Sequence, residues 1–354
     1  MVDISVLDKN LAVSNSIAPE IKAEFDFYDI DSNPFAICGV FREGDHYVRI
    51  PDAVAQTVSE PVSHLNQYTS GGRIRFVTDS KRIAIHAVCY NRLPSPHMAF
   101  TGTSGFDIYA HTNDNWQYFG SYKPPVDCEG VYEGVVSLPL EGKHTLQVNM
   151  PLYNGVYKVY IGIEKGAALE AAAPLLQPPV VYYGSSITQG ACASRPGNCN
   201  QAMLHRHFMT DYLNLGFSGN ARAEVEIMEY IAGLDMSMFV YDYDHNAPNV
   251  AHLQATHERG YRIIREKHPE LPILMMSRPK YHLSPTELER NAIIRATYEK
   301  ALAEGDKHVY YIDGRDLLLP YAREHSLVDG AHPSDVGFLG MYARMLPLME
   351  TLVK

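Results

Sequence analysis

The second half of the chain alternates short apolar segments with longer amphipathic ones, and this alternation restricts the fold more than any other feature. The apolar segments lie at 180–183, 212–216, 238–243, 273–277 and 309–313. Segments with helical periodicity lie at 199–209, 224–232, 250–268, 285–304 and 334–352. Apolar strands separated by helices are typical of a parallel sheet covered on both faces. The sequence therefore predicts an α/β domain in three layers.

The first half of the chain has a different periodicity. Residues 73–78 and 82–88 alternate apolar and polar side chains on either side of a short polar turn, as the strands of a hairpin do. Further strand candidates lie at 105–111, 116–120, 132–138, 144–150 and 156–163. Short strands at such spacing indicate an all-β sandwich or jelly roll. Before them, we expect short strands at 25–28 and 35–38 and a helix at 53–65.

The segment at 165–179 is rich in Ala, Pro and Leu and separates the two patterns. The chain has 354 residues, a length at which two domains are the usual organisation. We therefore expect a β-sandwich domain at 1–170 and an α/β domain at 171–354. The alanines indicate that part of the connecting segment is helical.

The charge balance narrows the range of partners. The formal net charge is −11 and no cluster of Lys or Arg stands out, so nucleic acid and membranes are not expected partners. The N-terminus lacks a basic region followed by an apolar one. The five cysteines form no Cys-x-x-Cys pair and are predicted to be reduced, with pairing of Cys192 and Cys199 left open. We expect a cytoplasmic protein that acts on a small molecule; a homo-oligomer is left open.

The first predicted strand of the α/β domain leads into the small residues Gly184-Ser185-Ser186. Small side chains let a ligand approach closely, and the N-terminus of the following helix supplies unpaired N–H groups. Ser186 is therefore a candidate nucleophile. The Gly-x-Ser-x-Gly elbow of α/β-hydrolases is excluded, because Thr188 stands where its second glycine would be. Taken alone, the stretch is equally consistent with a plain strand–turn–helix junction.

Three other loops carry residues that complement a serine. Gly219 follows the second strand and can aim its N–H outward, and Asn246 follows the third and offers a neutral donor to a developing oxyanion. Near the C-terminus, Asp329 and His332 are three residues apart, so the carboxylate can fix the imidazole tautomer. Each alone has a structural explanation: a glycine turn, an Asx turn and a helix N-cap.

This order of residues resembles the four sequence blocks of the SGNH (GDSL-type) hydrolases over residues 179–353. The resemblance implies a flavodoxin-like fold and ester hydrolysis without a cofactor or a metal. It implies that Ser186 is the nucleophile and first oxyanion donor, and that Gly219 and Asn246 are the other donors. His332 would be the general base and then acid, oriented by Asp329.

The third block departs from the family pattern. It is usually Gly-x-Asn-Asp, whereas here residues 244–247 read Asp-His-Asn-Ala, which leaves the role open between Asn246 and Asn249. Asp242, Asp244 and His245 could hold a cation, but we expect Asp242 to point into or behind the sheet. No His-Glu-x-x-His and no Cys/His set with zinc-site spacing occurs in the sequence.

The resemblance extends upstream. Residues 105–109, Gly-Phe-Asp-Ile-Tyr, resemble the Gly-x-Asp-Leu-Tyr motif of the β-sandwich domain that precedes some SGNH esterases, and 151–155 and 192–197 are similar to other stretches of that family. We expect Asp107 to stabilise the fold. The resemblance implies a serine-dependent hydrolase that removes short acyl groups, such as acetyl, from a carbohydrate or similar molecule. A carbohydrate-binding protein with an inactive SGNH domain and an SGNH thioesterase or lysophospholipase are the alternatives.

Four residues are candidates for substrate binding, because pockets form preferentially at domain interfaces. Tyr153 offers a stacking face and Asn154 a two-way amide, while His97 lies in a stiff loop between prolines and a methionine. Arg195, nine residues beyond Ser186, could bind sugar hydroxyls or an acid group. All four could equally hold the two domains together.

Overall fold

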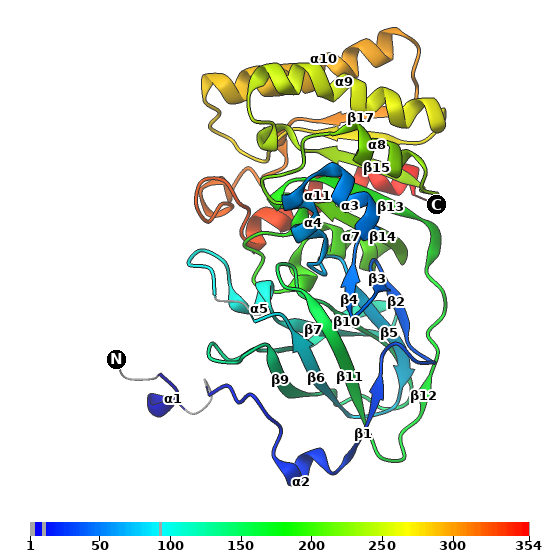
Figure 1. Ribbon diagram of the computed structural model, residues 1–354, viewed down its shortest axis with the longest axis vertical. Helices are drawn as coiled ribbons and strands as arrows, with labels where there is room; N and C mark the ends of the chain where they lie inside the picture. Colours follow the sequence, from blue (N-terminus) through cyan, green and yellow to red (C-terminus); the bar gives the residue numbers. More distant parts are fainter. Residues whose placement is uncertain (1–3, 9–11, 92–93, 354) are drawn as a thin grey trace.

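The computed structural model describes residues 4–8, 12–91 and 94–353. A β-sandwich occupies the lower half of Figure 1 and an α/β domain the upper half. The predicted fold class is confirmed, because an antiparallel β domain precedes a parallel sheet flanked by helices. None of the helices in these ranges combines the length and the apolar character that crossing a bilayer requires.

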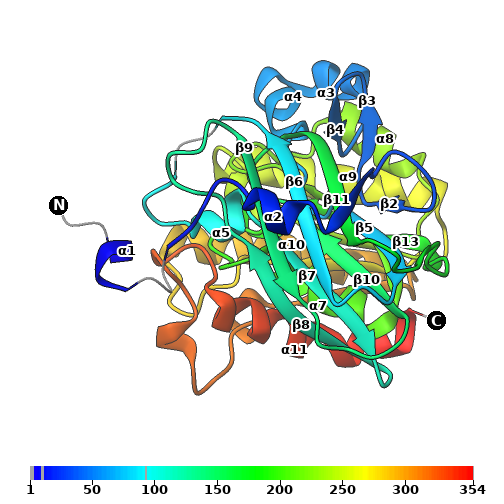
Figure 2. The same ribbon diagram turned by 90° about the horizontal axis from the view of Figure 1, so that it is seen from below.

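The sandwich consists of two antiparallel sheets, seen in front of the α/β domain in Figure 2. One sheet has the order β1 (Phe25–Asp29), β11 (Val156–Glu164), β6 (Arg82–Cys89), β9 (Val131–Ser137). The other has the order β12 (Leu169–Glu170), β5 (Arg73–Thr78), β10 (His144–Asn149), β7 (Phe106–Thr112), β8 (Asn115–Tyr122), with β2 (Ala36–Cys38) also paired to β5. Alternate side chains of the two sheets point inward, and Ile74, Ile85 and Val148 are among those buried in the shared core.

The α/β domain is built on a five-stranded parallel sheet. Its order is β14 (Thr210–Gly216), β13 (Leu176–Gly184), β15 (Met238–Asp242), β16 (Ile273–Met276), β17 (Val309–Ile312). Its longer helices are α7 (Asn200–Phe208), α8 (Val225–Ala232), α9 (Val250–Lys267), α10 (Pro285–Ala303) and α11 (Asp335–Leu352). From β13 the chain passes to β14 on one side, and from β14 it crosses back over β13 to β15 on the other side. Because both crossovers are right-handed and run in opposite directions, α7 and α8 lie on opposite faces of the sheet. Such a switch point is where ligands bind, beyond the carboxyl ends of the strands.

The boundary between the two domains along the sequence does not coincide with the boundary between their hydrophobic cores. The antiparallel sheets end at β12 and the parallel sheet begins at β13, and the connection between them contains no helix. Yet Ile50, Ala55 and Val62, from the first half, belong to the hydrophobic core of the α/β domain. Helix α3 (Asp52–Val58) accordingly packs against α8 (Figure 1).

The helix expected at 53–65 is two helices, α3 and α4 (Glu60–Asn66). Ser59 separates them, because its extended backbone ends α3 and its side chain accepts a hydrogen bond from the Val62 N–H at 3.3 Å. This is an N-cap, and the proline in the first turn of α4 strengthens the start of that helix. The remaining short elements are α1 (Ile4–Leu7), α2 (Pro19–Lys22), the hairpin of β3 (Phe41–Glu43) and β4 (His46–Val48), and α5 (Phe100–Thr103).

Candidate active site

The end of β13 presents one serine and uses the other for structure. Ser185 is fully buried and caps α6 (Ser186–Gln189), because its hydroxyl accepts from the Ile187 N–H at 3.1 Å. Ser186 is the first residue of that helix. Gly184 before it is required by close packing, since a Cβ there would lie 2.1 Å from the carbonyl oxygen of Asp242. The turn thus leaves only the hydroxyl of Ser186 available for chemistry.

Ser186, His332 and Asp329 form a continuous chain of hydrogen bonds. The Ser186 Oγ lies 2.9 Å from Nε2 of His332, and Nδ1 of the same ring lies 2.8 Å from Oδ2 of Asp329. A carboxylate accepts the Nδ1–H, so Nε2 carries the lone pair that can take the serine proton. The structure thus brings together the three residues that the sequence suggested as nucleophile, base and orienting acid.

The carboxylate of Asp329 is held by its own loop. Its Oδ1 accepts from the backbone N–H groups of His332, at 2.8 Å, and Ala331, at 3.0 Å. Partial burial alone would raise the pKa of Asp329, but the hydrogen bonds from the His332 N–H and ring lower it to about 2. Asp329 is therefore ionised at neutral pH and stabilises a protonated imidazole.

The loops after the neighbouring strands carry the residues that the sequence suggested as oxyanion donors. The Phe217 N–H donates to the carbonyl of Gly184 at 2.8 Å, and the carbonyl of Phe217 accepts from the Asn246 amide at 3.0 Å. These bonds connect the loops after β13, β14 and β15. An amide has two N–H groups, so this contact leaves one for a ligand. Gly219, on the same loop as Phe217, has φ +70° with open space where a Cβ would be.

The structure distinguishes the two asparagines that the third block left open. Asn249 is the N-cap of α9, and its side chain accepts from the His252 N–H at 2.8 Å. Asn246 ends the short 3-10 turn after β15 and bonds to the loop beside Gly219. The helix-capping explanation thus applies to Asn249, and Asn246 is the asparagine available to the site.

Comparisons with known proteins agree with this geometry. Residues 177–349 match the family model of the GDSL-like lipase/acylhydrolases, and residues 25–169 match the GxDLY model, described as the N-terminus of SGNH-hydrolase-type esterases. The chain belongs to the SGNH (GDSL-type) hydrolases. Ester hydrolysis is the class of reaction that this membership supports.

Solved structures share the whole two-domain arrangement of this SGNH hydrolase. A candidate GDSL-like lipase from Bacteroides ovatus has 25% identity and a TM-score of 0.84, covering 93% of this chain and 98% of that one. Salicylyl-acyltransferase SsfX3 from a tetracycline biosynthetic pathway has 20% identity and a TM-score of 0.76, over 93% and 98%. An acetyl xylan esterase from Butyrivibrio proteoclasticus has 10% identity and a TM-score of 0.59, over 92% and 98%. A search of curated proteins found no match.

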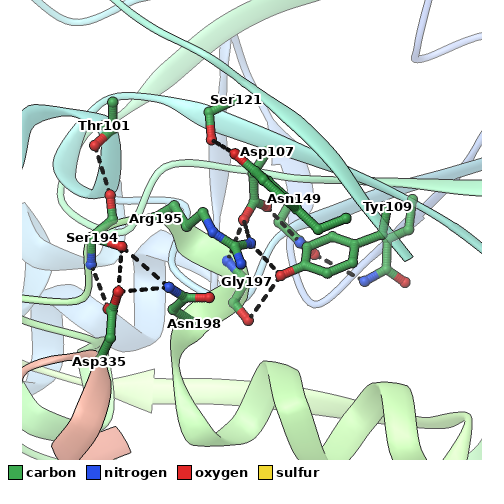
Figure 3. Close-up of polar contacts among 12 residues, drawn as sticks. Thr101, Asp107, Tyr109, Ser121, Asn149, Ser194, Arg195, Gly197, Asn198 and Asp335 are labelled. Atoms are coloured by element: carbon green, nitrogen blue, oxygen red, sulfur yellow. Dashed lines mark hydrogen bonds and ion pairs between the residues drawn. The ribbon is translucent and has the colours of Figure 1, made fainter. Parts of the chain in front are cut away.

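The GxDLY motif of this SGNH hydrolase works at the domain interface. Asp107, on β7, is completely buried, and its Oδ2 accepts from the Gly197 N–H at 2.8 Å and from Nη1 of Arg195 at 3.0 Å. Its Oδ1 accepts from the Asn149 amide at 2.7 Å. Arg195 also bonds to the hydroxyl of Tyr109 (Figure 3). The motif thus fixes the loop that follows α6.

That loop is in turn fixed to the helix that follows His332. The Ser194 N–H donates to Oδ1 of Asp335 at 2.9 Å, and the Asn198 amide donates to Oδ2 at 2.8 Å. Asp335 begins α11, three residues after His332 (Figure 3). The sequence reasoning missed Asp335, although a carboxylate in the first turn of a helix after a His-Pro pair could have suggested a loop anchor.

Three of the four expected substrate-binding residues have other contacts. Arg195 bonds to Asp107 and Tyr109, as a residue that holds the two domains together would. Tyr153 is only 3% exposed and donates to the carbonyl of Ser186 at 3.1 Å, so it has no free stacking face. Asn154 is equally buried and donates to the carbonyl of Tyr90 at 3.2 Å. These contacts depend on tertiary packing, which gives no local signal in the sequence.

His97 is the expected binding residue that does reach the site. It is exposed, and its ring centroid lies 5.9 Å from that of His332 at an interplanar angle of 42°. The Cys192 thiol donates to the backbone carbonyl of His97 at 3.3 Å. The loop of the sandwich that carries His97 therefore lies beside His332. Cys192 and Cys199 are both free thiols, so the pairing that the sequence left open does not occur.

Among the residues that the structure describes, two groups of side chains have the composition of a metal site. Asp242, Asp244 and His245 bring ligand atoms within 4.8 Å of one another, as do His97, Cys192 and His332. Burial and the neighbouring Asp244 raise the pKa of Asp242 well above its ordinary value, so the first group can exist as a neutral acid beside a carboxylate. The Oδ2 atom of Asp242 accepts a hydrogen bond at 3.3 Å from the hydroxyl of Thr188, which follows Ser186 in α6. This contact places Asp242 behind the serine turn, as the sequence led us to expect.

Proposed function

We propose that this SGNH hydrolase is a serine-dependent esterase that removes short acyl groups, acetyl foremost, from a carbohydrate or a similar small alcohol. The single observation that carries the proposal is the chain of hydrogen bonds from Ser186 through His332 to Asp329. A serine is an activated nucleophile when a general base lies within hydrogen-bond distance and a third group orients that base. Ser186 meets both requirements.

In the proposed reaction, His332 takes the proton as the Ser186 Oγ attacks the ester carbonyl. The oxyanion is stabilised by the Ser186 N–H, which lies in the first turn of α6 where N–H groups have no helical partner. The Gly219 N–H and the remaining Asn246 amide N–H complete the hole. His332 then protonates the leaving alcohol, and water releases the acid by the same steps in reverse. The proposed reaction needs no cofactor.

The small acyl group is proposed from the space around the serine. Ser186 is only 6% exposed, with Tyr153 packed beneath its backbone and the His97 loop beside His332. Such a narrow approach favours an acetyl group over a long acyl chain. The carbohydrate alcohol follows the family resemblance, and the acetyl xylan esterase named above shares this fold.

A substrate panel tests the proposal. The protein should hydrolyse p-nitrophenyl acetate faster than the octanoate, and should release acetate from acetylated xylo-oligosaccharides. Ser186→Ala should abolish both activities, while the neighbouring Ser185→Ala, which removes a helix cap worth about 1 kcal/mol, should keep most of the activity of the folded protein. No turnover of any ester by the wild type would contradict the proposal and favour a binding protein.

The same panel separates hydrolysis from transfer. The salicylyl-acyltransferase named above shares the fold, so an acyl-enzyme could in principle be taken by an alcohol. Adding a sugar alcohol to the p-nitrophenyl acetate reaction and measuring acetate against acetylated product decides between water and alcohol as acceptor. We expect acetate as the main product.

A further inference from the structure

Beside the triad, three metal-binding side chains converge from distant parts of the chain. His97 lies in the sandwich loop after β6, Cys192 in the loop after α6, and His332 before α11. One ligand atom from each lies within 4.8 Å of the others. Imidazole nitrogens and thiolates are ligands that Zn²⁺ prefers, whereas harder cations prefer oxygen ligands.

The bond that prepares His332 for catalysis also prepares it for a metal. Asp329 holds Nδ1 at 2.8 Å, which leaves the lone pair on Nε2. A histidine oriented by a carboxylate in this way is the usual arrangement around zinc. In the free protein, Nε2 faces the Ser186 Oγ at 2.9 Å, so a metal on this nitrogen takes the place of the serine proton.

The other two ligands need only a small adjustment. In a tetrahedral zinc site the ligand atoms lie about 3.3–3.6 Å apart, because Zn–S is about 2.3 Å and Zn–N about 2.0–2.1 Å. Ligand atoms that lie within 4.8 Å of one another must therefore approach by at most about 1.5 Å. The exposed side chain of His97 can rotate, and the thiol of Cys192 already lies 3.3 Å from the backbone carbonyl of His97.

We propose that His97, Cys192 and His332 form an inhibitory site for a soft divalent cation, with Zn²⁺ as its reference ligand. The Cys192 thiol binds as thiolate and releases its proton to solvent, and water or the Ser186 Oγ fills the fourth position. A metal on Nε2 removes the general base while leaving the fold unchanged. The inhibition rests on the proposed esterase function, whereas the binding does not.

Binding is tested on the full-length protein without any substrate. Zn²⁺ is titrated in competition with a fluorescent zinc indicator. The wild type should show one tight site that Cys192→Ser loses, because a serine hydroxyl is nearly isosteric and a poor zinc ligand. Cys128→Ser, at a half-buried free cysteine of the sandwich, is the matched control and should keep the site. Equal stoichiometry and affinity in the wild type and Cys192→Ser would overturn the proposal.

Co²⁺ provides an independent spectroscopic probe of the same ligands. A thiolate bound to Co²⁺ gives a charge-transfer absorption in the near ultraviolet. This absorption should appear in the wild type and in Cys128→Ser and be absent from Cys192→Ser. A charge-transfer absorption that survives Cys192→Ser would place the thiolate ligand elsewhere and overturn the assignment.

Inhibition is tested with p-nitrophenyl acetate. Zn²⁺ should inhibit the wild type reversibly on addition of EDTA, and the concentration for half-inhibition should rise at least tenfold in Cys192→Ser and in His97→Ala. Turnover by Cys192→Ser without metal should stay within about twofold of the wild type. Unchanged inhibition in Cys192→Ser would overturn the site. A protein that binds Zn²⁺ as expected but hydrolyses no ester would instead refute the proposed function.

Discussion

Two aspartates of this molecule bind a basic side chain in opposite settings. Asp107 holds Arg195 across the domain interface with no exposed surface, and all its donors are fixed. Asp329 holds His332 within one short loop, and its side chain is 34% exposed. An arginine stays charged, so its carboxylate partner can stay buried. A histidine that acts as a general base gains and loses a proton, and the partial exposure of the second pair suits such a role.

The comparison separates stability from catalysis. The interaction of Asp107 crosses 88 residues of sequence and ties the sandwich to the loop after the nucleophile. The interaction of Asp329 spans three residues and orients only one ring. The same conservative change at the two positions should therefore affect different properties, which makes Asp→Asn a matched pair of variants.

The largest expected effect is on the rate of Asp329→Asn. An amide at this position favours the wrong tautomer of His332, which costs about 10⁴-fold in kcat in other serine hydrolases. We expect a loss of this order with p-nitrophenyl acetate, while the circular dichroism spectrum and melting temperature change little. A variant with near wild-type kcat would show that Asp329 does not orient His332.

Asp107→Asn should have the reverse profile. The NH2 group of the new amide would point at another donor, either the Gly197 N–H or the Asn149 amide, and Arg195 would lose its counter-charge. Breaking one partner of a buried charged pair costs about 3–5 kcal/mol. We expect a lower urea midpoint, measured by intrinsic fluorescence, and a kcat for the folded fraction that falls far less than in Asp329→Asn. An unchanged midpoint would mean that the domains are held together elsewhere.

The difference between the two aspartates also explains what the sequence could predict. Ser186, Gly219 and Asn246 lie directly after apolar strands, so their local pattern places them at one edge of the sheet. Asp329 and His332 are close in sequence and could be paired. The contacts of Asp107 with Arg195, of Tyr153 with Ser186, and of Asp335 with Ser194 join segments whose spacing carries no information. Burial of Tyr153 likewise depends on how the two domains pack.

The next largest effect on kcat is expected at Asn246, the proposed oxyanion donor. Asn246→Ala removes an N–H that acts mainly in the transition state, and loss of one such donor lowers kcat by about 10²–10³-fold. We expect this decrease with little change in KM on p-nitrophenyl acetate. Asn249→Ala is the matched control, since it removes only the cap of α9 and should lower stability by about 1 kcal/mol. A larger loss of kcat in Asn249→Ala would exchange their roles.

A smaller effect is expected at the contact between the domains beneath the nucleophile. Tyr153→Phe removes the hydroxyl that donates to the Ser186 carbonyl but keeps the buried ring. One such hydrogen bond contributes about 1 kcal/mol. We expect kcat to fall by less than about tenfold, equally for p-nitrophenyl acetate and an acetylated oligosaccharide, because the residue positions the turn and does not choose the substrate. A loss confined to the oligosaccharide would restore a substrate-binding role to Tyr153.

The smallest expected effect is on stability in acid. The pKa of Asp329 lies at about 2 in the folded protein against an ordinary 3.8, so its contribution to stability is complete above about pH 4 and is lost as the pH falls through about 2. Glu287 and Asp313, also lowered to about 2, give the wild type and Asp329→Asn a shared decline over this range. The urea midpoint of Asp329→Asn should therefore fall less steeply than that of the wild type between pH 4 and 2. Parallel curves of urea midpoint against pH would show that the charge of Asp329 contributes nothing measurable to stability. A large difference between the curves would mean that Asp329, like Asp107, mainly stabilises the fold.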